Sequence, residues 1–383
     1  MQNQRLKVLS ISRPVFDIIK RDGWTGRVLA NYRRACNLVT AEGEAVSSHD
    51  VTVFALVGLA IGNGPLNIVI EGAGVLETVK PGWPAVFSDG QLILGDSLVV
   101  SLDGAKLWRP EVNWGRLTTQ PRRLERNLAA LCSWLSQNDT SQSAPAGSPD
   151  PAAWRRQATV EEDFPRCTQP AAGACDLLSL VLDEKKGPRA REDGTRSEVE
   201  TASPHNQVFL TMARAAIKGL MQSLQDGDRS GIRENAALLA GLGPGLTPAG
   251  DDYLVGLMAG LRLWPALLEN SGLSPEEACP IILEATEGRT TLLSRAFLRS
   301  AKEGLFGENW HELLAELARG ETIGIQRAAK RILSSGATSG ADALAGFLSP
   351  YRYFARQRTY RGDGHLNDKS LDNPPFCGRL LLD

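Results

Sequence analysis

Apolar and polar positions follow two different spacings along the chain, and the spacing changes near residue 120. Before that point, short runs rich in Val, Ile and Leu are separated by turns that contain Gly and Asp. This pattern predicts many short strands, folded into a small β-rich sandwich or barrel-like domain over residues 1–120. The clearest strand candidates are residues 51–56, 67–70, 91–94 and 97–100.

From residue 204 to residue 350, apolar positions recur every three or four residues, which is the spacing of one helix face. This spacing predicts an all-α domain over residues 204–350. Residues 121–137 fit one more helix, which we expect to connect the two domains. The fold class that follows is α+β, with the strands first and the helices after them. The predicted helices of the α domain are residues 208–224, 229–242, 253–268, 275–287, 290–305, 309–318 and 322–333.

Two stretches show neither spacing. Residues 138–203 are rich in Ser, Pro, Ala and charged side chains, and they cannot bury enough apolar surface to offset the entropy of ordering. We therefore predict a polar, largely flexible insert, in which only residues 177–182 dock as a short helix. Residues 351–383 mix Arg and Tyr with Gly, Asn and Pro, and they predict an irregular tail.

Composition excludes several classes of protein. The 42 Lys and Arg side chains nearly balance the 44 Asp and Glu side chains, so the chain lacks the basic footprint of a nucleic-acid binder. The basic cluster at residues 122–126 is typical of a solvated helix face. Six Cys without a CxxC pair and four His without an HExxH spacing disfavour a disulfide framework and a zinc site. The longest apolar run, residues 51–61, is too short to span a bilayer, and we expect a cytoplasmic protein with no membrane or nucleic-acid partner.

The most informative segment is residues 245–256, with the sequence GLTPAGDDYLVG. Its glycines permit positive φ angles and close approach of other backbone. Thr247 followed by Pro248 fits the cap and the first residue of a helix. Asp251 and Asp252 then place two carboxylates at the start of that helix, where backbone N–H groups also favour an anion.

The two adjacent carboxylates can be interpreted in three ways. As catalytic or binding groups, Asp251 and Asp252 orient a substrate amide, or they bind a divalent metal ion such as Mg²⁺ through oxygen. In the structural reading they only cap backbone donors. The residues expected to bind a substrate anion at this turn are Gly243, Gly245, Thr247 and Gly250.

A shorter copy of the motif lies at residues 336–346, with the sequence GATSGADALAG. Because both copies contain Gly-x-Asp-x-Leu-x-Gly, we expect two helices related by pseudo-symmetry whose polar turns face one cleft. Asp342 would then approach Asp252 from the opposite side and add a third catalytic carboxyl. Further candidates for binding the anion are Thr338, Ser339, Ser294 and Arg295.

Gly256 and Gly260 lie four residues apart on the helix that follows the first turn, which is apolar nearly all round. Such a helix is buried, and small residues at this spacing let another backbone approach it closely. We expect this packing to hold the Asp251 and Asp252 turn in place from behind.

Residues 243–254 resemble the signature of the AllH-type subunit of bacterial oxamate carbamoyltransferase. The usual pattern of that family is Gly-Pro-Gly-Leu-Thr-Pro-Ser-Gly-Asp-Asp-Phe-Leu, and Ala249 and Tyr253 depart from it. Ala337 stands where family members often have His. Residues 290–294 and 336–342 also match the family, and the strands around residues 64–68 resemble it more loosely.

The resemblance implies a cytoplasmic subunit that acts with two other subunit types in the catabolism of ureide nitrogen from allantoin. Its complex would phosphorolyse oxalurate to oxamate and carbamoyl phosphate, which a separate carbamate kinase then uses. The expected partners are those subunits, a small anionic ureide and phosphate.

The residues themselves leave alternatives to this activity. One is a non-catalytic scaffold, or a regulatory subunit, whose Gly-Asp-Asp turn binds an effector, a metal or a partner loop. Another, less well supported, is a stand-alone metal-dependent amide hydrolase, because two Asp without His make a poor hydrolytic metal site.

Overall fold

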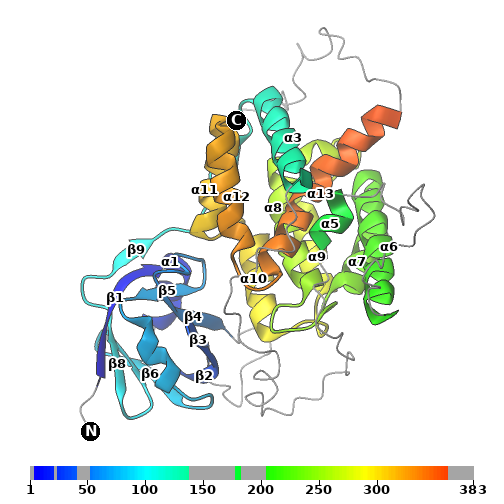
Figure 1. Cartoon of the computed structure of the whole chain (residues 1–383). Coiled ribbons are helices and arrows are strands. Elements are labelled where there is room, and N and C mark those ends of the chain that lie inside the picture. The colour runs from blue at the N-terminus through cyan, green and yellow to red at the C-terminus, as the bar shows by residue number, and fades with distance from the viewer. Residues whose placement is uncertain (1–3, 21–23, 41–51, 138–176, 183–203, 361–383) are drawn as a thin grey trace, which may run out of the picture.

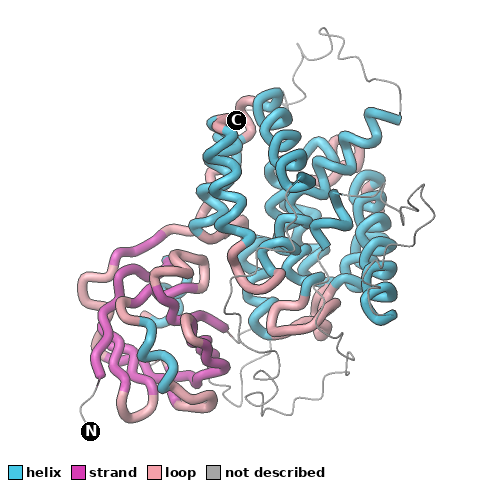
Figure 2. The backbone as a smooth tube through the Cα atoms, viewed as in Figure 1, coloured by secondary structure: helices cyan, strands magenta, loops and turns pink. Residues whose placement is uncertain are grey.

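The computed structural model describes residues 4–20, 24–40, 52–137, 177–182 and 204–360. Strands gather at one end of the molecule and helices at the other, as Figures 1 and 2 show. The chain forms an N-terminal β-barrel over residues 4–108 and then a helical region. The α+β fold class predicted from the sequence is therefore confirmed.

Eight strands close the barrel in the order β5-β4-β3-β2-β6-β7-β8-β1, because β1 also pairs antiparallel with β5. The end of β1 pairs in parallel with β9. Closure gives the backbone groups of the terminal strands partners, so no long open edge is left among these eight strands. The strands are β1 (Gln4–Ser12), β2 (Thr25–Tyr32), β3 (Ala35–Thr40), β4 (Val53–Gly58), β5 (Asn67–Ile70), β6 (Pro84–Ser88), β7 (Gln91–Leu94), β8 (Leu98–Ser101) and β9 (Lys106–Trp108), accompanied by helix α1 (Arg13–Ile19) and the 3₁₀ turn η1 (Ala73–Thr78).

Every predicted helix is present in the helical region, with ends that shift by a few residues. The central one is α8, in which all residues except Asp252 and Val255 are buried. The helices are α2 (Trp114–Leu117), α3 (Pro121–Gln137), α5 (Leu177–Leu182), α6 (Pro204–Asp226), α7 (Arg229–Leu239), α8 (Ala249–Leu263), η3 (Pro265–Leu268), α9 (Pro275–Ala285), α10 (Leu292–Lys302), α11 (Glu308–Arg319), α12 (Thr322–Leu333) and α13 (Ser339–Tyr360).

The prediction of an irregular tail from residue 351 is wrong for its first part, because α13 continues as a helix to Tyr360. Trp264 explains this continuation, since its ring packs edge-on against Tyr351 (5.4 Å between centroids) and Phe354 (5.9 Å). Residues 361–383 lie outside the described residues. So does the predicted insert at 138–203, apart from α5, which forms the short helix expected there.

Helices α8 and α13 lie side by side and touch through their backbones. A Cβ added to Gly256 would overlap the carbonyl oxygen of Ala343, and one added to Gly346 would overlap that of Tyr253. The two contacts are reciprocal, as they are when two equivalent helices cross at a two-fold axis. One turn further along α8, a Cβ on Gly260 would overlap the carbonyl of Phe347. The predicted close packing of this helix is therefore confirmed.

The helical region contains the same three-helix arrangement twice, as α6–α7–α8 and as α11–α12–α13. In each copy a left-handed glycine ends the first helix, Gly227 at φ 71° and Gly320 at φ 84°, and the next helix begins two residues later. The copies differ in the turn before their last helix, which covers residues 240–248 in the first and 334–338 in the second.

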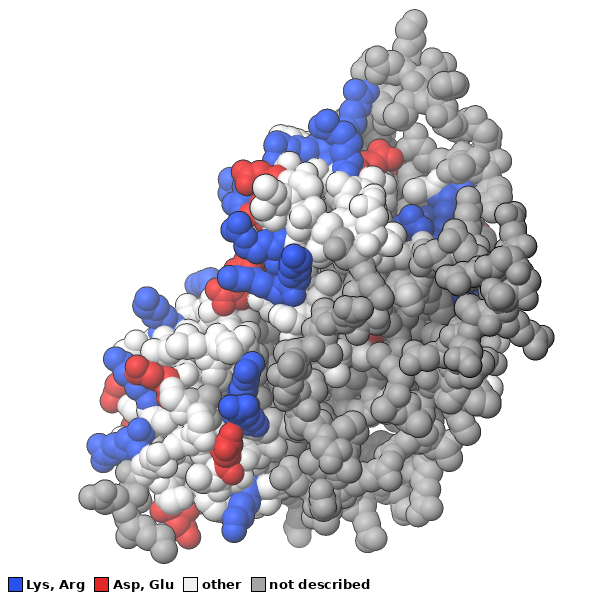
Figure 3. All heavy atoms as spheres, viewed as in Figure 1, with Lys and Arg blue, Asp and Glu red and all other residues white. Residues whose placement is uncertain are grey.

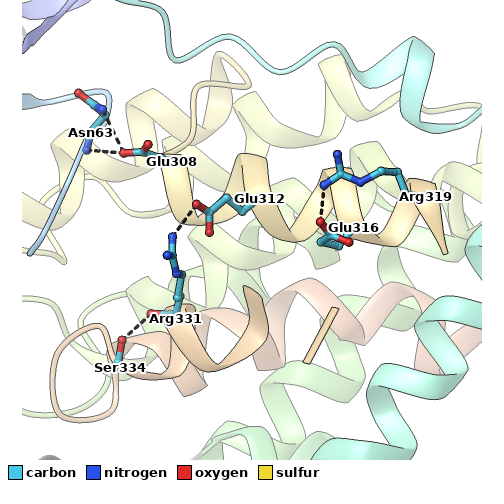
Figure 4. A network of polar contacts seen from close by, with 7 residues as sticks. All are labelled: Asn63, Glu308, Glu312, Glu316, Arg319, Arg331 and Ser334. Atoms are coloured by element: carbon cyan, nitrogen blue, oxygen red, sulfur yellow. Dashed lines mark hydrogen bonds and ion pairs between the residues drawn. The ribbon is translucent and has the colours of Figure 1, made fainter. Parts of the chain in front are cut away.

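A polar contact joins the barrel to the second copy. The backbone and side-chain N–H groups of Asn63, in the loop after β4, donate to Glu308 Oε2 at 3.2 and 3.0 Å. On the next turns of α11, Glu312 pairs with Arg331 of α12 at 2.6 Å, and the Ser334 hydroxyl donates to the Arg331 carbonyl at 2.8 Å. Figure 4 shows these contacts running from the barrel loop to the turn before α13.

The visible face in Figure 3 carries both signs of charge, with Lys and Arg frequent over the region of α3, α11 and α12. Ion pairs join some of them to acids, among them Arg319 to Glu316. Arg122 and Arg126 are exposed on α3, so the prediction of a solvated helix face is confirmed. None of the described helices combines the length and the apolar character that crossing a bilayer requires.

The reciprocal backbone contact predicts a large loss of stability for either glycine. Gly256→Ala and Gly346→Ala should each lower the free energy of unfolding by about 2 to 3 kcal/mol, because the added methyl forces α8 and α13 apart. Gly115→Ala in α2, where an added Cβ meets no atom within 4 Å, is the matched control and should change it by less than about 0.5 kcal/mol. Urea denaturation of the full chain measures both, and equal effects of Gly256→Ala and Gly115→Ala would contradict the packing argument.

Candidate functional site

The two polar turns meet where α8 and α13 begin. The hydroxyl groups of Thr247 and Ser339 lie 3.0 Å apart and share a hydrogen bond. These residues are separated by 92 positions in the sequence, so the contact depends on the helix crossing behind it. The structure therefore brings together the turns that the sequence predicted to be partners.

The first turn requires glycine at three positions. Gly241, Gly243 and Gly245 have φ angles of 70°, 112° and 104°, which other residues rarely adopt. Thr247, however, does not cap the helix as predicted. Pro248 (φ −54°, ψ 146°) is the capping residue and α8 begins one residue later, so the Thr247 hydroxyl is available to Ser339.

Three backbone N–H groups in the first turn of α8 already have acceptors. Gly250 donates to the carbonyl of Leu242 at 2.9 Å, and Asp251 and Asp252 donate to that of Pro248 at 2.9 and 3.1 Å. An anion at this helix start would have to displace these contacts. The donors that face the other turn are hydroxyl groups instead.

Asp251 connects the first turn to the segment before α10. Its side chain is 1% exposed, its Oδ1 accepts the backbone N–H of Gly241 at 2.8 Å, and its Oδ2 accepts the Thr290 hydroxyl. Burial raises the pKa of this carboxyl, and the hydrogen bonds from Thr290, Gly241 and Ser294 offset part of the rise. Both oxygens of Asp251 are thus occupied by protein donors.

Asp252 has a different environment. It is one of the two residues of α8 that are not fully buried, yet its Oδ2 is buried and no described group donates a hydrogen bond to it. Burial raises the pKa of this carboxyl well above its usual value, and the carboxyls of Asp342 and Asp251 raise it further. The hydroxyls of Ser339 and Thr247 lie near enough to offset part of that rise.

Asp342 occupies the corresponding position of the second copy. Its side chain is fully buried, and its Oδ1 accepts the backbone N–H of Leu177, at the start of α5, at 3.0 Å. Thr338 contributes its carbonyl to the first turn of α13, where it accepts the N–H of Asp342. Asp342 therefore fastens α5 to the start of α13.

The predicted groups on α10 also contact protein atoms. Thr291 caps α10 by accepting the N–H of Ser294, and its hydroxyl donates to the carbonyl of Leu246 at 2.6 Å. Ser294 is buried and lies 3.5 Å from the same carbonyl. Arg295 pairs with Glu287 at 2.8 Å. These contacts hold the first turn against α10.

Across the described parts of the chain, no group of three or more His, Cys, Asp and Glu side chains is arranged to hold a metal ion. Asp251 uses both oxygens on N–H and O–H donors, which leaves Asp252 as the one carboxylate of the predicted pair with an open oxygen. The described pair thus offers a cation one open carboxylate oxygen, and the Mg²⁺ site stays a prediction.

Three partners of the carboxyls were not assigned from the sequence, namely Thr290 and the backbone N–H groups of Gly241 and Leu177. The role of Thr290 could have been inferred from the sequence. Thr290 directly precedes the capping Thr291, and a helix start needs only one such hydroxyl, so the second hydroxyl is free to bind another group. Nothing in the sequence indicated that Leu177 contacts Asp342, since 165 positions separate the two residues.

Asp252→Asn is expected to stabilise the folded protein at neutral pH and above. Because the folded state binds the Asp252 proton more tightly than the unfolded chain does, the stability linked to that proton is complete below the usual Asp pKa of 3.8 and is lost as the pH rises through the raised pKa. Asn stays neutral and avoids the loss. Thermal melting at a series of pH values should give a higher Tm for the variant, with a gain that shrinks in acid.

Asp96→Asn, at an exposed turn of the barrel, is the control and should show no such pH-dependent gain. A lower Tm for Asp252→Asn than for the wild type at neutral pH would contradict the account of this carboxyl.

The sequence matches two family descriptions. Residues 7–107, which form the barrel, match the N-terminal domain of the AllH family, and residues 239–350 match the oxamate carbamoyltransferase subunit AllH. The second match contains both polar turns and the helices that cross behind them. No solved structure matches the chain significantly. The two matches cover most of the barrel and the part of the helical region that holds the carboxyls, and the chain belongs to the AllH family.

Proposed function

We propose that this chain is a subunit of a cytoplasmic carbamoyltransferase complex that phosphorolyses oxalurate to oxamate and carbamoyl phosphate, in the breakdown of allantoin-derived ureides. The observation that supports the proposal most directly is the meeting of the two turns at Thr247 and Ser339, beside Asp252, inside the segment that matches the family. In this proposal the chain assembles with two other subunit types, and the complex binds phosphate and oxalurate as substrates.

The reaction suits a site with hydroxyl donors. A phosphate oxygen bonds to the carbamoyl carbon, negative charge develops on the carbonyl oxygen, and the bond from that carbon to the oxamate nitrogen breaks. Donors positioned for the charged oxygen lower the barrier of such a step. In the proposal, Thr247 and Ser339 supply these donors, since their hydroxyls lie 3.0 Å apart, one in the turn before α8 and the other at the start of α13.

The remaining predicted residues hold this arrangement. Asp251 fixes the turn through Gly241 and Thr290, and Ser294 holds it against α10. Phosphate needs a cation, and Arg295 is already paired with Glu287. We therefore assign the binding of phosphate to groups beyond Arg295, including those of the other subunits.

Ser339→Ala tests whether the turn is catalytic. Loss of one donor to a developing oxyanion lowers kcat by about a hundredfold or more. The variant should therefore assemble normally with the other subunits, as judged by size-exclusion chromatography, while forming carbamoyl phosphate at about one hundredth of the wild-type rate. Ser88→Ala, an exposed serine of the barrel, is the control and should leave kcat unchanged.

The opposite results would favour a scaffold. Ser339→Ala with wild-type kcat in an intact complex would reject the catalytic reading, and loss of assembly without a change in kcat per assembled complex would assign the turn to subunit contact. Turnover of oxalurate by the purified chain alone would contradict the proposal that it acts only in a complex.

A further inference from the structure

Asp252 and Asp342 are equivalent residues of the two three-helix copies. Each lies two residues after a glycine at the start of its helix, and each of those glycines packs against the preceding helix of its own copy. A Cβ on Gly250 would overlap the carbonyl of Leu239 in α7, and one on Gly340 would overlap that of Ile332 in α12. The two carboxyls therefore leave equivalent backbone positions on either side of the α8–α13 crossing.

The two carboxyls nevertheless have different partners. Asp342 accepts a backbone amide N–H, that of Leu177, at 3.0 Å. Oδ2 of Asp252 and Oδ2 of Asp342 are both buried and accept no hydrogen bond from the described residues, so the two carboxyls differ in the contact with Leu177 and in accessibility. A buried carboxyl oxygen without a hydrogen bond is destabilising unless another molecule supplies the missing donor or proton. Asp252 is also the more accessible residue of the two and lies beside the Thr247 and Ser339 hydroxyls.

We propose that Asp252 binds an amide N–H group of the ligand, as Asp342 binds the amide N–H of Leu177. Asp342 is then a positioning residue, because its contact with α5 fixes the start of α13 next to the site. The identity of the ligand as a ureide or oxamate rests on the proposed function, whereas the recognition of an amide nitrogen rests on the two carboxyls alone.

Within the proposed reaction, this assignment gives Asp252 a defined proton transfer. The carboxylic acid of Asp252 gives its proton to the oxamate nitrogen as the carbon–nitrogen bond breaks and the phosphate oxygen bonds to the same carbon. The resulting carboxylate accepts an N–H of the oxamate product, and the proton lost by hydrogen phosphate restores the acid. Burial, which raises the pKa of this carboxyl, favours the acid form that begins this sequence.

Oxamate and pyruvate are suitable probes, because they share a carboxylate and the neighbouring carbonyl and differ in an amide nitrogen against a methyl group. Isothermal titration calorimetry on the assembled complex should show oxamate binding about 10- to 100-fold more tightly than pyruvate, which is the usual size of a hydrogen bond to a charged group. Asp252→Asn should reduce this ratio to about threefold or less, mainly by weakening the binding of oxamate.

Asp342→Asn is the matched variant at the equivalent position, and it should keep the preference for oxamate, because an Asn oxygen can still accept the N–H of Leu177. An unchanged preference in Asp252→Asn, an equal loss in both variants, or a wild-type complex that does not prefer oxamate to pyruvate would each overturn the assignment. If the Asp342→Asn variant does not assemble, the ratio of oxamate to pyruvate affinity in Asp252→Asn alone decides whether Asp252 binds the amide N–H. The proposed function fails separately, if the wild-type complex forms no carbamoyl phosphate from oxalurate and phosphate.

Discussion

The backbone contact between α8 and α13 is the constraint on which the arrangement of the turns depends. Gly256 and Gly346 each face a carbonyl oxygen of the opposite helix, and the absence of side chains lets the two helices cross at backbone distance. Because both helices begin a few residues before this crossing, their first turns must also lie close together. The hydroxyl pair of Thr247 and Ser339 follows from that geometry.

Much of this arrangement could be predicted from the sequence. The apolar spacing gave the helices, and the repeated Gly-x-Asp-x-Leu-x-Gly pattern correctly indicated that the turns before α8 and α13 are partners. Both patterns can be recognised within a dozen residues of sequence. One is a glycine that permits close packing, and the other is a carboxylate in the first turn of a helix. The close packing at Gly256 and Gly260 was predicted on the same basis.

What could not be predicted depends on contacts between distant segments. Closure of the barrel requires β1 to pair with β5, and nothing within either strand specifies that pairing. The amide that Asp342 accepts belongs to Leu177, in a short helix within a polar stretch. The cap assigned to Thr247 was wrong because Pro248 adopts an extended backbone and takes that place, which residue preferences alone do not decide.

The presence of both three-helix copies in one chain has a consequence for how their carboxyls can differ. In a dimer of identical subunits, every substitution appears on both sides of the two-fold axis. A carboxyl that stabilises the fold on one side must therefore have the same structural role on the other. Covalent linkage removes this restriction, and each copy can change independently. Here the turn around Gly241, Gly243 and Gly245 is longer than its counterpart. One aspartate is fully buried and holds a helix of its own chain, while its counterpart stays partly accessible.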